Sequence, residues 1–145
     1  MEKILTLKWV LENEYIMENT DMGYVAVVTT AGGSFSGQIN GIVEPAGSTT
    51  WVSTTEENSV LTFNLVLKED NGGHIFTEGN LILNLDPKLE EKIVNGETLD
   101  KSEYYFKGTM AFHTGEEQLK FLERKLFIVE AEINQEGYGM EVYMP

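Results

Sequence analysis

Cysteine is absent from this sequence of 145 residues, and histidine is scarce, with only two. Without cysteine the chain has no disulfide framework, no thiolate metal site and no cysteine nucleophile. Neither His74 nor His113 belongs to a spacing typical of zinc ligands, so we expect both on the surface and expect no metal and no cofactor. A chain without cysteine also fits a reducing cytoplasm.

Positive charge is also in short supply. The chain has 10 basic and 24 acidic residues, which gives a net charge of −14. Such a surface repels phosphate groups, and no cluster of Lys or Arg offsets the repulsion. Nucleic acid and membrane surfaces are therefore excluded as expected partners.

Long apolar runs are missing as well. The first residues, MEKILTLKWVLENEY, mix Lys and Glu with apolar residues and do not resemble a signal sequence. No segment approaches the length of about 20 apolar residues that a membrane-spanning helix needs. We expect a soluble, cytoplasmic protein in which residues 1–145 form one domain.

What the sequence does contain is alternation of apolar and polar residues with a period of two, which is typical of half-buried β-strands. It is clearest in Leu5, Leu7, Trp9 and Leu11, and again in Leu61, Phe63, Leu65 and Leu67. Turn sequences separate such segments: NTDMG near Asn19, EDNGGH from Glu69, and NQEGYG near the C-terminus. The count is roughly nine strands, and a sheet of this kind must close or double over to protect its edges. We expect an all-β fold, a closed antiparallel barrel of the up-and-down kind or a partly open one.

Two segments interrupt the alternation and predict short helical turns. The first has Asp86 as N-cap, Pro87 at the first helical position and Gly96 as a stop. The second begins at Thr114, with Glu117 at the capping-box spacing. Both are too short to form a layer, so we expect them to act as lids or plugs at the ends of the barrel.

The glycine-rich stretch AGGSFSGQINGIVEPAGSTTW, residues 31–51, lacks the pattern of a phosphate-binding loop. Interpreted as a strand, it places on one face Phe35, Gly37, Ile39, Gly41 and Val43. Two explanations of the glycines remain open. They bend the sheet so that it closes, or they leave room for a ligand.

A closed barrel of this size holds either a packed core or one small ligand. If it holds a ligand, an apolar or aromatic small molecule fits the inward side chains, with the Thr77 and Tyr104 hydroxyls as polar anchors. The candidate ligand-binding residues are Trp9, Phe35, Gly37, Gly41, Trp51, Phe63, Thr77, Tyr104, Phe106, Phe112 and Phe127.

Two other functions stay open. An isomerase or cyclase using acid–base chemistry would draw on Tyr104, Lys107, Glu130 and Glu132, provided that they converge on one cavity. A structural role as a homo-oligomer is indicated by residues 24–28, which are apolar on both faces of the expected strand.

Several blocks resemble one family of bacterial and fungal proteins. GGSFSGQINGIVEPAGSTTW resembles its glycine signature, KEDNGGHI its central turn, and residues 104–143 its C-terminal block. The family is known as domain of unknown function three-two-three-seven, and the resemblance implies a closed antiparallel barrel similar in outline to lipocalins and streptavidin. The positions that fit are Gly33, Gly37, Gly41, Pro45, Gly47, Trp51, Phe112, Thr114 and Leu122.

This chain departs from the family pattern at two positions. Thr50 stands where the signature has Asp, and Lys107 stands where Arg is expected. Lys does not reproduce the two-pronged grip of Arg on a carboxylate. Both departures weigh against an enzymatic site shared with the family.

Overall fold

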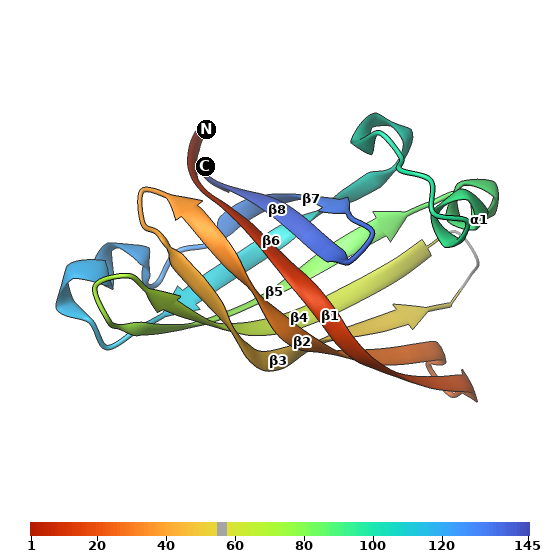
Figure 1. Ribbon diagram of the computed structural model, residues 1–145, viewed down its shortest axis with the longest axis horizontal. Helices are drawn as coiled ribbons and strands as arrows, with labels where there is room; N and C mark the ends of the chain where they lie inside the picture. The colour runs from red at the N-terminus through yellow and green to blue at the C-terminus, as the bar shows by residue number, and fades with distance from the viewer. Residues whose placement is uncertain (55–57) are drawn as a thin grey trace.

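Eight antiparallel strands close into one barrel in the computed structural model, which describes residues 1–54 and 58–145 (Figure 1). Each strand pairs with the next along the chain, and the last pairs with the first. The strands are β1 (Glu2–Thr20), β2 (Gly23–Gly37), β3 (Gly41–Ser53), β4 (Asn58–Glu69), β5 (His74–Asn84), β6 (Tyr105–His113), β7 (Phe127–Ile133) and β8 (Gly137–Met144). The predicted all-β, closed antiparallel barrel is confirmed.

The expected count of roughly nine strands is one too high for the described residues. Strands β1 and β2 are the longest, and both run through bulges at which their pairing register shifts. Alternation that changes phase inside one long strand looks in sequence like two short strands.

The interior holds the residues that the alternation assigned to it. Strands β4 and β5 alternate almost perfectly between buried and exposed positions. Rings touch across the barrel: the Trp9 and Phe63 centroids lie 5.8 Å apart, and those of Phe112 and Phe127 lie 5.1 Å apart. These side chains belong to one continuous apolar cluster, which is the core of the domain.

The glycine-rich stretch is a hairpin and not one strand, so the single-face interpretation of residues 35–43 is wrong. Strand β2 ends at Gly37, and β3 begins at Gly41, directly opposite Phe35. Gly37 has φ of +145°, and its N–H donates to Asn40 Oδ1 at 3.2 Å, which closes the turn. A positive φ of this kind is readily adopted only by glycine.

Three short helical segments connect the strands: α1 (Pro87–Val94), η1 (Lys101–Glu103) and η2 (Glu117–Leu122). The prediction for α1 is confirmed, since Asp86 caps it by accepting from the Lys88 N–H at 2.9 Å and Pro87 is its first residue. The two ends of the barrel differ. Segment η2 lies at one end and buries Leu119 and Leu122, whereas α1 lies at the other end and buries no residue fully (Figure 1).

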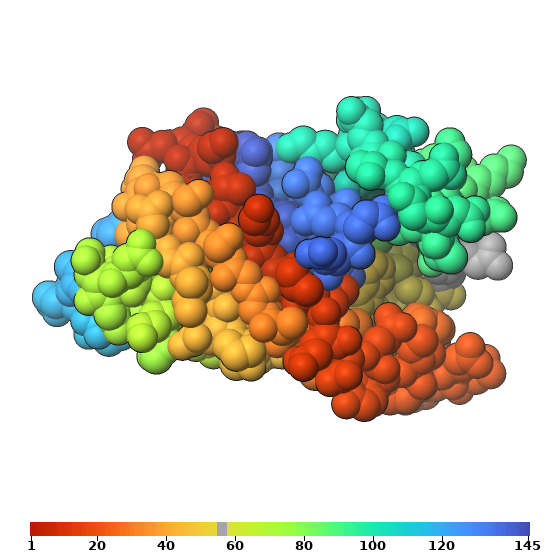
Figure 2. Space-filling view, in the orientation of Figure 1, coloured from red at the N-terminus to blue at the C-terminus, as the bar shows by residue number. Residues whose placement is uncertain are grey.

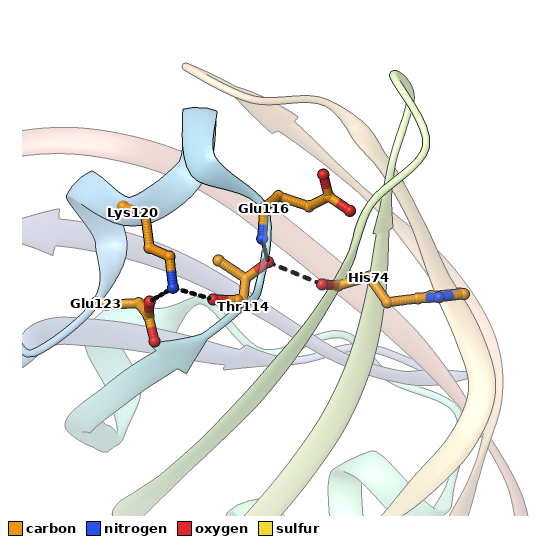
Figure 3. A network of polar contacts seen from close by, with 5 residues as sticks. All are labelled: His74, Thr114, Glu116, Lys120 and Glu123. Atoms are coloured by element: carbon orange, nitrogen blue, oxygen red, sulfur yellow. Dashed lines mark hydrogen bonds and ion pairs between the residues drawn. The ribbon is translucent and has the colours of Figure 1, made fainter.

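The capping box predicted for Thr114 is wrong. Helix η2 begins after Glu116 without a side-chain cap, and the Thr114 hydroxyl instead donates to the His74 carbonyl at 3.0 Å (Figure 3). The same hydroxyl accepts from the Glu116 N–H, while Lys120 Nζ donates to the Thr114 carbonyl at 3.1 Å. Thr114 therefore attaches the η2 segment to the start of β5.

Replacing Thr114 by valine is expected to lower the free energy of unfolding by about 1–2 kcal/mol, because a part-buried carbonyl and a part-buried N–H lose their hydroxyl partner. Urea unfolding followed by circular dichroism measures the change. Thr109→Val on β6 is the matched control, since no hydrogen bond of its hydroxyl is found among the described residues, and it should change stability by less than about 0.5 kcal/mol. Equal losses in both variants would contradict the role of Thr114.

No helix in residues 1–54 or 58–145 is long and apolar enough to cross a membrane.

Candidate ligand-binding site

An open pocket of 860 Å³ lies at the end of the barrel that carries α1. Figure 2 shows the β1–β2 ribbon and the segment around α1 projecting on either side of a recess at this end. The described residues that line the pocket are Glu14, Tyr24, Ala26, Trp51, Ser53, Thr54, Ser59, Leu83, Leu85, Pro87, Glu90, Ile93, Val94, Ile133 and Tyr138. Its size falls in the range of about 300–1,000 Å³ that is common for small-molecule sites.

Tyr138 forms the boundary between the pocket and the packed core. Its ring lies 5.4 Å from Trp9 and 5.8 Å from Phe106, which are both buried, and 5.8 Å from Trp51, which is half-exposed. Burial raises the pKa of the Tyr138 phenol. A hydrogen bond with the Trp51 indole lowers this pKa, but by less than burial raises it. The phenol therefore stays protonated, and the pocket has a neutral aromatic floor.

A bulge in β1 brings Glu14 to the pocket. Leu11 pairs with Thr30, but Glu14 pairs with Val28, so β1 has one more residue than β2 in this interval. Residues directly opposite each other in an antiparallel pair point to the same face, and Val28 is buried inside the barrel. The bulge thus turns Glu14 toward the inner side, although the alternation from Leu5 to Leu11 would place it outside.

Helix α1 supplies the opposite wall. Glu90, Ile93 and Val94 all line the pocket, as does Pro87 at the start of the helix. Burial raises the pKa of the Tyr24 phenol, and the nearby carboxylates of Glu14, Glu18 and Glu90 raise it further. Carboxylates from β1 and from α1 therefore share the pocket lining with Tyr24.

Of the residues predicted to bind a ligand, only Trp51 lines this pocket. Most of the others lie in the packed interior, where each is at most 3% exposed: Trp9, Phe35, Phe63, Thr77, Phe106, Phe112 and Phe127. The hydroxyls of the two proposed polar anchors already form hydrogen bonds within the protein. Thr77 donates to the Ala111 carbonyl at 2.8 Å, and Tyr104 accepts from the Ile133 N–H at 3.0 Å.

The two glycines do not border the pocket either. A Cβ on Gly41 would lie 2.7 Å from Cζ of Phe35, so the Phe35 ring occupies the space beside it. Gly37 is exposed in the β2–β3 turn, where a Cβ would lie 2.4 Å from the Ile4 carbonyl oxygen. Both glycines permit close packing of neighbouring groups.

The residues considered for acid–base chemistry do not converge. Lys107 and Glu130 form an ion pair of 4.0 Å on the outer face, where their side chains are 50% and 37% exposed. Glu132 is also exposed. Thr50 pairs with Thr62 on the outer face of β4, so the departure from the family signature at this position lies outside the pocket. This arrangement does not support the acid–base hypothesis.

Both histidines are exposed, as expected. His74 lies 2.9 Å from Glu44, and His113 lies 3.0 Å from Glu78. The first contact reaches from β5 to β3 across β4, and the second joins the neighbouring strands β6 and β5, both on the outside of the barrel. The histidines take no part in the pocket.

The strand proposed as an interface between copies has one interior face. Ala26 and Val28 are buried in the barrel, and only Val25 and Val27 face outward, half-buried. Self-association stays a prediction, which a size measurement in solution tests.

Every lining residue except Trp51 was missed by sequence reasoning, and the ones that matter most for the pocket's chemistry are Glu14, Tyr24, Glu90 and Tyr138. Tyr138 was assigned to the interior by its alternation but not to a site. The one available signal for Glu90 was the prediction of α1 as a lid, because a lid implies that the residues on its inner side face a mouth. Nothing in the local pattern indicated the bulge that turns Glu14 inward.

Comparisons with known proteins agree with this architecture. A UPF0311 protein of Clostridium acetobutylicum is 22% identical over 129 residues, which cover 88% of this chain and 82% of that protein. A conserved protein of unknown function from Rhodopseudomonas palustris has a similar structure, with a TM-score of 0.90, 22% identity, and coverage of 97% of this chain and 93% of that one. An enzyme from Penicillium herquei shares the fold more distantly, with a TM-score of 0.66, 12% identity, and coverage of 97% and 92%.

These likenesses show the fold. The model of one protein family matches almost the whole chain, residues 1–144. The resemblance noted in the glycine signature and in the C-terminal block is thereby confirmed, and the chain belongs to the family described as protein of unknown function (DUF3237).

Proposed function

We propose that this barrel binds an apolar or aromatic small molecule in the pocket beside α1. The observation that supports the proposal is the contrast between the two ends of the barrel. Leu119 and Leu122 fill one end, whereas the other end leaves 860 Å³ open above the rings of Trp51 and Tyr138. Pockets with apolar walls and a few polar groups are the usual form of a small-molecule site.

The walls favour such a ligand. Leu83, Leu85, Ile93 and Ile133 supply aliphatic surface, while Ser53, Ser59 and the Tyr138 phenol are the nearest neutral polar groups. Covering this apolar surface with an apolar ligand removes it from water, which stabilises the complex by about 25 cal/mol for each Å² buried.

Nile red, a neutral dye whose emission rises in apolar surroundings, tests the proposal. We expect saturable binding to the wild-type protein. Trp51→Ala should weaken it about tenfold, because the dye loses contact with one large aromatic side chain. Ile93→Ser, which changes the opposite wall, should also weaken it, so the result does not depend on one variant.

Phe121→Ala is the matched control for this experiment. Phe121 is an aromatic residue on η2 at the far end of the barrel and is 40% exposed. Its removal should leave the affinity for Nile red unchanged, with circular dichroism confirming that all three variants fold. Absence of saturable binding, or equal losses in the Phe121 and Trp51 variants, would overturn the proposed function.

A further inference from the structure

The charges around the pocket have one sign. Glu14 enters its lining from β1 and Glu90 from α1, and the described residues of the lining include no Lys, Arg or His. A ligand in the pocket therefore meets negative charge at the mouth and no compensating positive group.

Neither carboxylate is engaged by a cation in residues 1–54 or 58–145. Several other carboxylates do have basic partners: Glu44 pairs with His74, Glu123 with Lys120 and Glu141 with Lys3. Within the described part of the chain, Glu14 and Glu90 enter no ion pair and no side-chain hydrogen bond. Their full hydrogen-bonding capacity is available to a bound group.

Both carboxylates belong to the pocket lining, Glu14 on β1 and Glu90 on the opposite wall formed by α1. Both raise the pKa of the Tyr24 phenol in addition to the effect of its burial, as Glu18 also does. Walls of low polarity strengthen the field that such charges produce in a recess, and the net charge of −14 adds to it. A cation is attracted into this recess and an anion is repelled from it.

The aromatic residues favour the same sign of charge. Trp51, Tyr24 and Tyr138 line the pocket, and the faces of aromatic rings attract ammonium groups. An organic amine would thus find carboxylates, aromatic rings and aliphatic side chains in one lining.

We propose that the ligand of this pocket is a cation, namely an apolar or aromatic amine whose ammonium group lies against Glu14 and Glu90 and whose body covers Trp51. This inference rests on the proposed function, since it specifies the ligand class for the same pocket.

Three probes with the same biphenyl body separate charge from shape: biphenylmethylamine, biphenylmethanol and biphenylacetate. Each competes with Nile red for the pocket. We expect the amine to bind about five- to tenfold more tightly than the alcohol, with the acid weakest. The preference for the amine should shrink as salt is added, because exposed carboxylates are screened.

Two conservative variants test whether Glu14 and Glu90 cause the preference for the amine over the alcohol. Glu14→Gln and Glu90→Gln should each weaken binding of the amine about threefold and leave binding of the alcohol unchanged. Glu117→Gln removes the same charge from η2 at the far end of the barrel, and it should leave the amine preference intact.

The outcomes distinguish this inference from the proposed function. If Nile red binds and the three probes compete equally, the pocket function stands and the cationic ligand is overturned. If Glu117→Gln weakens the amine as much as the pocket variants do, net charge and not this site causes the preference, and the inference is again overturned. If neither Nile red nor any probe binds, both proposals fail.

Discussion

Replacing Trp9 by alanine is expected to lower the free energy of unfolding by about 3–5 kcal/mol, which is the usual cost of removing a fully buried large aromatic side chain. Trp9 is 1% exposed, and its ring lies 5.8 Å from Phe63 and 5.4 Å from Tyr138. It thus joins the packed core to the floor of the pocket. Urea unfolding followed by circular dichroism measures the loss.

Trp9→Phe is the informative companion. The indole Nε1 of Trp9 is buried and has no hydrogen-bond partner among the described residues. Burying an unpaired donor costs about 1–3 kcal/mol, so removing it offsets much of the lost packing. We expect Trp9→Phe to cost only about 1 kcal/mol.

The exposed Tyr15 provides a control for the loss of a large ring. Tyr15 is 57% exposed on β1, and Tyr15→Ala should change stability by less than about 0.5 kcal/mol. If Trp9→Phe proved as destabilising as Trp9→Ala, the account of an unpaired indole in a well-packed core would be contradicted.

Gly41→Ala is expected to destabilise the barrel by about 3 kcal/mol, because one methyl group meets two neighbours that have little room to move. Its Cβ would lie 2.0 Å from the Lys68 carbonyl oxygen on β4 and 2.7 Å from Cζ of Phe35 on β2. Since Gly41 pairs with both neighbouring strands, relief of the contact requires that backbone pairs separate. The same unfolding measurement reports the cost.

Two further variants separate the backbone contact from the ring contact. Gly115→Ala is the matched control, because a Cβ there meets nothing within 4 Å, and it should be neutral. Shortening the ring by Phe35→Leu in the Gly41→Ala background should recover only part of the stability, since the contact with the Lys68 oxygen remains. Complete recovery of stability would show that the contact with the Lys68 carbonyl oxygen does not contribute to the loss.

Much of the fold follows from local pattern. Alternation assigned Leu61, Phe63 and Leu65 to the interior, and all three are fully buried. Turn chemistry located the β4–β5 connection, and capping chemistry located α1 from Asp86 and Pro87. These features were predictable because each depends on the preferences of residues within a few positions of one another.

The failures have a common physical cause. Thr114 matched the spacing of a capping box, but its hydroxyl donates to His74, a residue 40 positions away. Gly41 was considered as a gap for a ligand, but Phe35 from the neighbouring strand fills that space. In both cases the pairing of strands brings the partner into place, Phe35 opposite Gly41 and the start of β5 beside the end of β6, and the residue's own local pattern does not record it.

The alternation of apolar residues and the turn and capping residues were sufficient to predict an all-β antiparallel fold with two short helical segments, and the resemblance of the glycine signature and of the C-terminal block indicated the family and its closed barrel. The tertiary structure alone decided where the barrel is open. That depends on a bulge in β1 that turns Glu14 inward, on η2 closing one end, and on α1 standing beside the other. A one-residue change of register moves every later side chain of a strand to the opposite face, and register is set by pairing between strands and not by the strand itself.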